Sequence, residues 1–255
     1  MLTFMTCFVF ILGAAIGSFL NVCIFRMPAE TSIIKPGSRC PHCLKPLHFY
    51  DNIPLISFII LRGKCRDCGG KISWRYPLVE LLTAVLAVIL FLKFGLTLNF
   101  FVFFIFVSVL IVITFIDLDH QIIPDVLTLP GIPLFFLAAV FLVRIPWREA
   151  LLGLLIGGGV LLAIALVYEL IAKREGMGGG DIKLLAMIGG FLGWKSLLFI
   201  LLFSSLFGAI VGFTLIIIKK QDMKYAVPFG PFLAAAVVAY IFWGEGFTRL
   251  LFMNY

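Results

Sequence analysis

The chain has 255 residues, of which 62% are hydrophobic and only 13% charged, and its mean hydropathy is +1.16. A soluble domain carries about 25% charged residues, so this composition excludes a single soluble core and predicts an integral membrane protein. The net charge is +7, but aromatic and basic residues do not alternate, so we predict no nucleic-acid binding.

The apolar stretches predict an all-α polytopic membrane protein with about eight transmembrane helices, because roughly 20 apolar residues span a bilayer. The first stretch has no basic segment before it and no small-residue cleavage motif, so we expect a transmembrane helix rather than a signal peptide. The sixth predicted helix is short for a membrane span, so a tilted helix and a re-entrant helix are both alternatives for it. The predicted helices are Leu2–Phe25, Leu78–Leu92, Leu96–Ile116, Val126–Val143, Ala150–Ala172, Ile182–Trp194, Ser196–Ile218 and Ala226–Trp243.

The basic residues predict the orientation of these helices. Nine of the twenty Lys and Arg lie between Arg26 and Arg75, and a loop rich in positive charge is typically cytoplasmic. With eight spans, fifteen of the twenty basic residues fall on the cytoplasmic side. Both termini are then expected to face outward.

The loop at 26–77 carries two Cys-x-x-Cys pairs with 21 residues between them. Four thiolates at this spacing can converge on a structural Zn²⁺ and supply folding energy to a loop with little apolar content. Two disulfides or a redox pair are the alternative, which a reducing cytoplasm disfavours. The predicted ligands are Cys40, Cys43, Cys65 and Cys68.

Four of the thirteen acidic residues form two groups at one predicted membrane face. Asp117, Asp119 and Asp125 lie at the end of the third predicted helix, and Asp181 lies at the start of the sixth. Such residues can be interfacial end-caps, and Asp181 can be a helix N-cap. Two adjacent carboxylates can instead share a proton and activate water against a carbonyl, which is aspartic-protease chemistry. The chemistry of the residues alone does not decide whether Asp117 or Asp119 is the catalytic partner of Asp181.

Three glycines, Gly178, Gly179 and Gly180, precede Asp181. Because they carry no side chains, an extended substrate backbone could approach the Asp181 carboxyl closely. We therefore predict that these glycines contact substrate.

The stretch GMGGGDIKL at 176–184 resembles the Gly-x-Gly-Asp motif of the prepilin peptidases, the type IV leader peptidase family of membrane aspartic proteases. Four further stretches match the bacterial family in order along the chain. They are GSFLNVCIFRMP at 17–28, the paired Cys motifs, RYPLVELLTA at 75–84 and IDLDHQIIPD at 116–125.

The resemblance implies an enzyme that cuts the short basic leader from type IV prepilins or type II secretion pseudopilins, at the cytoplasmic face of the bacterial inner membrane. It implies cleavage after a Gly, just before the hydrophobic segment. It also implies that Asp117 and Asp181 are the catalytic pair, because the family's first Asp precedes Ile-Pro with the spacing that Asp117 has to Pro124. The implied domains are the first transmembrane helix 1–25, the zinc loop 26–77 and the peptidase core 78–255.

Bifunctional bacterial members also N-methylate the new N-terminal residue, commonly Phe, with S-adenosylmethionine, and share the long zinc loop. No Gly-x-Gly-x-x-Gly unit identifies the methyl-donor site here. Glu30 and Glu80, near the ends of the loop, are weak candidates for which a structural role fits better.

A basic loop does not complement a basic leader, so we interpret its charge as topology and anchoring to membrane lipid. Recognition of the leader then falls to acidic residues, among them Asp119, Asp125 and Glu175.

Two other classes of protein fit parts of the pattern. In a proton-coupled transporter, paired acids would relay protons and glycines would break a helix, but we find no convincing inverted repeat. In a zinc-organised membrane scaffold, the acids would be replaceable without loss of function.

Overall fold

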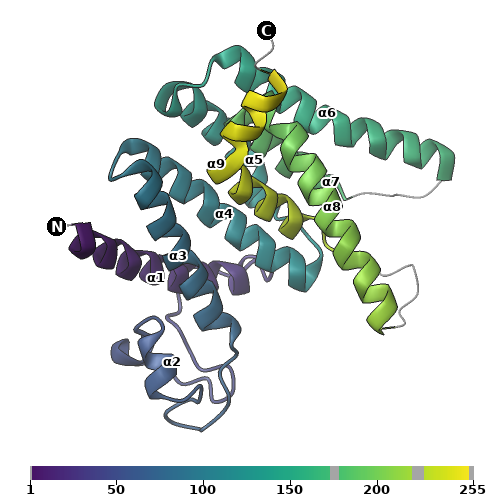
Figure 1. Ribbon diagram of the computed structural model, residues 1–255. Coiled ribbons are helices and arrows are strands. Elements are labelled where there is room, and N and C mark those ends of the chain that lie inside the picture. The colour runs from purple at the N-terminus through teal and green to yellow at the C-terminus, as the bar shows by residue number, and fades with distance from the viewer. Residues whose placement is uncertain (1, 173–177, 220–226, 253–255) are drawn as a thin grey trace. The chain divides into compact units, whose positions relative to one another are not determined.

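The computed structural model describes residues 2–172, 178–219 and 227–252, which form helices and no β-strand (Figure 1). The chain divides into two compact units, residues 1–112 and 113–255, and the fourth α-helix contributes to both. In chain order the elements are α1 (Leu2–Arg26), η1 (Phe49–Asn52), α2 (Ile56–Ile60), α3 (Arg75–Phe94), α4 (Leu98–His120), α5 (Asp125–Ala138), η2 (Ala139–Val143), α6 (Trp147–Ala172), α7 (Gly179–Leu192), α8 (Trp194–Lys219) and α9 (Gly230–Phe252).

In the first unit, α1 packs against α3 with almost no space between the two backbones. A methyl group added to Gly13 would lie 2.8 Å from Ala84 Cα, and one added to Gly17 would lie 2.7 Å from Glu80 Cα. Small residues at such positions let apolar helices approach closely. Close packing matters for helix association in a membrane, because lipid provides little hydrophobic driving force between helices. The close contact places Glu80 at the point where the loop meets the two helices.

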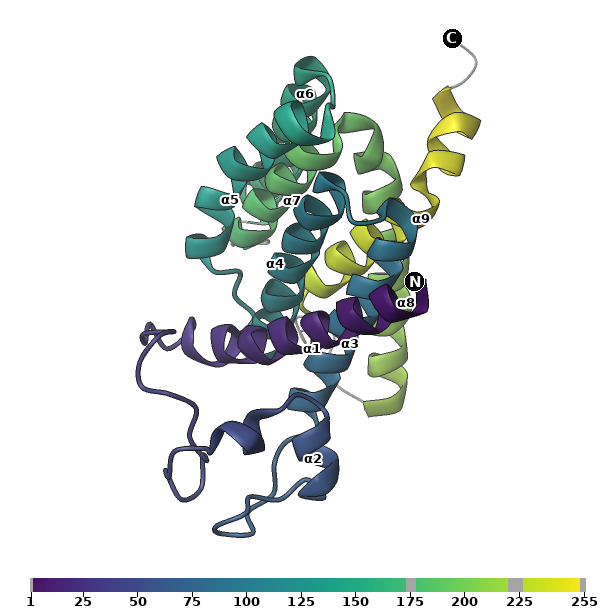
Figure 2. The ribbon, with the colours of Figure 1, turned by 90° about the vertical axis from the view of Figure 1, so that its left-hand side faces the viewer.

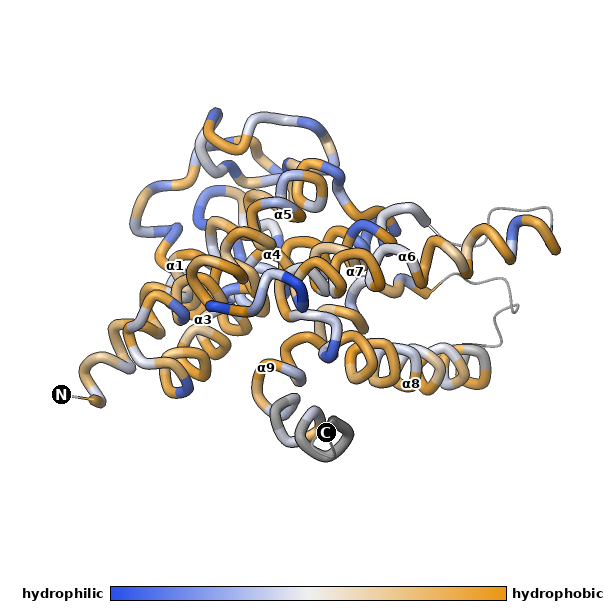
Figure 3. The backbone as a smooth tube through the Cα atoms, turned by 90° about the horizontal axis from the view of Figure 1, so that it is seen from above, coloured by the Kyte–Doolittle hydropathy of each residue, from blue (hydrophilic) through white to orange (hydrophobic). Residues whose placement is uncertain are grey.

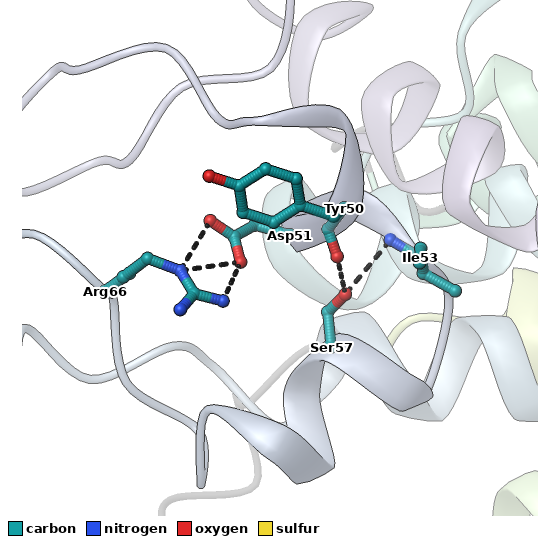
Figure 4. Close-up of polar contacts among 5 residues, drawn as sticks. All are labelled: Tyr50, Asp51, Ile53, Ser57 and Arg66. Atoms are coloured by element: carbon teal, nitrogen blue, oxygen red, sulfur yellow. Dashed lines mark hydrogen bonds and ion pairs between the residues drawn. The ribbon is translucent and has the colours of Figure 1, made fainter.

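The loop between α1 and α3 is held together by polar contacts around η1 and α2 (Figure 4). The Arg66 guanidinium pairs with the Asp51 carboxylate, with an Nη2–Oδ1 distance of 2.7 Å. The Ser57 hydroxyl donates to the Tyr50 carbonyl at 2.8 Å and accepts from the Ile53 N–H at 3.1 Å. These bonds tie η1 to both α2 and the second Cys motif.

In the second unit, α6 and α7 meet backbone to backbone (Figure 2). A methyl group on Gly153 would collide with the Gly189 carbonyl, and one on Gly157 would lie 2.5 Å from the Leu185 oxygen. α7 also packs on α5, and it ends at Gly193, whose φ of +82° stops the helix. This packing fixes the helix that carries Asp181.

Among the described residues, six helices are long and apolar enough to cross a membrane, and most of the helical tube is hydrophobic in Figure 3. The chain is therefore an all-α, multi-pass membrane protein, as predicted. All eight predicted helices are present, but eight spans are not confirmed. α7 has 14 residues, or about 21 Å of helix at 1.5 Å per residue, and α9 offers only the apolar stretch Gly230–Gly244. The orientation of the termini stays a prediction.

The start of α9 differs from the prediction of a helix from Ala226. Ala226 lies outside the described residues, and 227–229 are not helical, so the helix begins at Gly230. Pro231 follows at the second helical position, where its missing N–H costs no hydrogen bond. The first free backbone N–H of α9 is consequently available to a partner.

Candidate functional site

Asp117 lies in the last turn of α4 and is 5% exposed. Its Oδ2 accepts a hydrogen bond of 2.9 Å from the Gly230 backbone N–H, at the N-terminus of α9. A methyl group on Gly230 would lie 2.7 Å from the same oxygen, so the lack of a side chain there lets the carboxylate reach the helix end. The positive end of a helix dipole stabilises a negative charge at such a position.

Asp181 is the third residue of α7, not its N-cap. The N-cap is Gly178, whose carbonyl accepts the Asp181 N–H at 3.2 Å. The interpretation of Asp181 as a capping residue is therefore wrong. Asp181 lies outside the six candidate spans, and burial first and the charge of Asp117 second raise the pKa of its carboxyl to about 6. The two carboxyl groups thus interact electrostatically.

Ile123, in the turn between α4 and α5, connects the surroundings of the two carboxyls. A methyl group on Gly180 would lie 2.7 Å from Ile123 Cβ, and one on Gly230 would lie 3.5 Å from Ile123 Cδ1. The residue before Asp181 and the hydrogen-bond donor to Asp117 therefore pack on one side chain. Through Ile123, the start of α7 and the start of α9, which are far apart in sequence, meet at the candidate site.

The other acidic residues lie in different environments. Asp119 is exposed, whereas Asp117 is buried, so the structure distinguishes the two side chains that chemistry alone did not. Asp125 begins α5 and pairs with Lys183 of α7 at 2.7 Å. Glu175 lies outside the described residues.

The three glycines before Asp181 differ from one another. A methyl group on Gly178 or Gly179 would meet nothing within 4 Å, whereas Gly180 is packed against Ile123. Gly178 and Gly179 leave an open surface beside Asp181, and Gly180 allows α7 to approach the turn before α5. The structure gives these adjacent glycines two separate uses.

The four predicted zinc ligands converge. Their Sγ atoms lie within 4.8 Å of one another, and Cys40 Sγ and Cys68 Sγ are 3.8 Å apart. Thiolates at about 2.3 Å from one tetrahedral ion are about 3.8 Å from each other, so the donor set fits a zinc ion. The Cys43 backbone N–H lowers the pKa of the Cys40 thiol to about 6, against burial, which raises it. One ligand is thereby prepared to bind as thiolate.

The two Cys motifs fold into equivalent turns. In the first, the Cys40 N–H donates to Lys45 O and the Leu44 N–H donates to Cys40 O. In the second, the Cys65 N–H donates to Gly70 O and the Gly69 N–H donates to Cys65 O. The fifth residue of each turn has positive φ, +59° at Leu44 and +68° at Gly69. We call these turns the two knuckles.

A cavity of about 720 Å³ lies in the first unit, between the loop and the adjoining ends of α1 and α3. Its lining includes Ser18, Asn21 and Glu80 of the two helices as well as residues of both knuckles. Glu80 is 8% exposed, and its Oε2 accepts the Leu55 N–H at 2.8 Å. The volume lies in the range of small-molecule sites, about 300–1,000 Å³.

Reasoning from sequence missed Gly230 and Ile123. The available signal for Gly230 was its place before Pro231 inside a predicted helix, which marks a helix start. No comparable local signal identifies Ile123, because its contacts come from residues more than 50 positions away.

Comparison with known proteins identifies the family of the chain. Residues 11–94 match the family model of the bacterial peptidase A24 N-terminal domain, and residues 104–213 match that of the type IV leader peptidase family. The chain is 39% identical to the prepilin leader peptidase/N-methyltransferase of Aeromonas hydrophila, over 97% of this chain and 93% of that protein. It is 36% identical to the protein of the same name from Pseudomonas aeruginosa, over 97% and 93%. No solved structure gives a significant match. The chain belongs to the type IV leader peptidase family.

Proposed function

We propose that this protein cleaves the basic leader from type IV prepilins or type II secretion pseudopilins at the cytoplasmic face of the bacterial inner membrane. It then N-methylates the new N-terminal residue. Family membership supports both activities, since relatives that match nearly the whole chain carry both in their names.

The observation that carries the peptidase proposal is the electrostatic contact between two partly buried carboxyls, Asp117 and Asp181, on helices of the second unit. Neither is paired with a basic residue in the part of the chain that the structure describes, unlike Asp125 with Lys183. Two such carboxyls can share one proton, which they keep below the raised pKa of about 6. This is the state that aspartic-protease chemistry requires.

We propose a different role for each carboxyl. Asp117, whose Oδ2 accepts from the first N–H of α9, is the carboxylate that takes the proton from the water attacking the scissile carbonyl. Asp181, whose pKa is raised to about 6, keeps its proton, donates to the carbonyl oxygen and then protonates the leaving amine. Gly178 and Gly179 leave room for the extended substrate beside Asp181.

The loop serves the second activity. A structural zinc ion held by Cys40, Cys43, Cys65 and Cys68 joins the two knuckles, and S-adenosylmethionine supplies the methyl group. The exposed basic residues of the loop anchor it to anionic lipid headgroups. The peptidase core is residues 78–255, and Asp119 contacts the basic leader.

The test is cleavage of a purified prepilin in detergent by wild type and by Asp117→Asn, Asp181→Asn and Asp119→Asn. Each protein is first checked for monodispersity and zinc content. We expect the variants at 117 and 181 to lose cleavage by at least about 10³-fold, as loss of a catalytic group does in other proteases. Asp119→Asn should keep cleavage, with a raised KM. Activity retained by all three variants would refute the aspartic mechanism and reopen the transporter and scaffold interpretations.

A further inference from the structure

The cavity of the first unit contains a buried carboxylate without a counter-cation. Of the three acidic residues in its lining, Asp51 pairs with Arg66 at 2.7 Å and Asp67 pairs with Lys45 at 3.5 Å. Glu80 forms no ion pair among the described residues. Its partners are two neutral donors, the Leu55 N–H and the Ser18 hydroxyl.

The lack of an ion pair at Glu80 among the described residues is informative because of where this side chain lies. The residue is 8% exposed and lies in the second turn of α3, where the cavity reaches the two membrane helices. A charge at the edge of hydrocarbon is costly unless it is paired. A cationic ligand in the cavity would supply the missing partner.

The backbone beside Glu80 is strained. Leu55 has φ +62° and ψ −48°, and the Pro54 carbonyl accepts the Ile56 N–H at 2.6 Å, which closes a three-residue γ-turn. Such a turn with positive φ is rare outside glycine and strains the backbone. The turn directs the Leu55 N–H at Glu80 Oε2 and so fixes the carboxylate in the cavity. Strain of this kind concentrates at ligand sites.

We propose that this cavity is the methyl-donor site and that the Glu80 carboxylate faces the sulfonium of S-adenosylmethionine. The proposal rests on the N-methylation in the proposed function. The cavity volume of about 720 Å³ accommodates a nucleoside with an amino-acid tail, and the unpaired carboxylate matches the positive charge of a sulfonium.

The location also suits the acceptor. The new N-terminus of a cleaved prepilin directly precedes an apolar segment, so its amine lies at the membrane surface. Residues of α1 and α3 form the part of the cavity nearest their membrane-spanning stretches. There the neutral amine attacks the methyl carbon. The N–C bond forms as the S–C bond breaks, the bonding pair stays on sulfur to give a thioether, and the ammonium proton passes to water.

Binding measurements with the full-length protein in detergent test this assignment. S-adenosylhomocysteine is the matched probe, because it lacks the methyl group and its sulfur is neutral. We expect Glu80→Gln to raise the Kd of S-adenosylmethionine by about tenfold or more, or about 1.4 kcal/mol, because it removes the negative charge that faces the sulfonium. The Kd of S-adenosylhomocysteine should rise less than about threefold. Glu149→Gln, which removes a carboxylate paired with Lys195 outside the cavity, is the control and should change neither Kd.

Equal loss for both ligands, or no change for either, would overturn the sulfonium assignment. Prepilin cleavage and zinc content report whether Glu80→Gln is folded. If it is not, irradiation of wild type with radiolabelled S-adenosylmethionine decides: label within residues 18–80 supports the cavity, and label beyond residue 112 refutes it. Wild type that neither binds the donor nor methylates prepilin would refute the proposed N-methylation itself. Wild type that methylates while Glu80→Gln binds normally would refute only the present inference.

Discussion

Gly230→Ala should damage peptide cleavage without unfolding the protein. The added methyl group would lie 2.7 Å from Asp117 Oδ2, whereas ordinary contact begins at 3.4 Å, so the carboxylate must move by about 0.7 Å. That displacement lengthens the 2.9 Å hydrogen bond from the Gly230 N–H beyond useful range. Misplacing a reacting group by about 1 Å costs about 100-fold in rate, so we expect kcat to fall by about 10- to 100-fold. Gly230 has no positive φ, so alanine is compatible with the backbone.

The assay is steady-state cleavage of a prepilin in detergent, with kcat and KM determined separately. Gly246→Ala is the matched control, because it lies in the same helix and its added methyl group meets nothing within 4 Å. We expect the control to keep the wild-type kcat. A Gly230→Ala protein with wild-type kcat and an unchanged melting temperature would refute the role given to the α9 N-terminus.

Three further predictions follow from the packing, the pKa and the cysteine site. Because Asp181 must keep its proton and its pKa is raised to about 6, kcat/KM should fall as the pH rises through about 6, and a pH profile without that alkaline limb would contradict the assignment. Gly153→Ala should lower stability by about 1–3 kcal/mol in a detergent melt, because its methyl group collides with the α7 backbone; Gly159→Ala, which meets nothing within 4 Å, should be neutral or slightly stabilising. Elemental analysis should find about one zinc per wild-type chain and less than half of that in Cys40→Ser, since three thiolates leave the tetrahedral site incomplete.

Local patterns in the sequence were sufficient to predict several features of the structure. Each long apolar stretch became a helix, because a chain in lipid must satisfy its backbone hydrogen bonds internally. The four cysteines converged because each Cys-x-x-Cys pair closes its own turn. The two acidic groups came to one site because they lie at helix ends on the same predicted face.

The short α7 was expected from the sequence, and the structure adds its cause, because the positive φ of Gly193 ends the helix after 14 residues. Two other features were not predicted. The Gly230 N–H reaches Asp117 across more than 100 residues of sequence. Leu44 occupies the positive-φ position that glycine fills in the second knuckle, and nothing in its sequence neighbourhood indicates that conformation.

The equivalence of the two knuckles has a consequence for regulation by metal supply. Each knuckle closes by its own backbone hydrogen bonds. The Lys45–Asp67 ion pair and a hydrogen bond between His42 Nε2 and Lys71 O connect the two knuckles, and an ion held by all four cysteines would join them more firmly. Both knuckles contribute walls to the cavity beside Glu80. Thermodynamic linkage then makes zinc and the methyl donor heterotropic effectors of one another: whatever factor zinc adds to donor affinity, the donor returns to zinc affinity. With the zinc site and the donor site as proposed, a cell short of zinc would accumulate enzyme with a weakened methylation step.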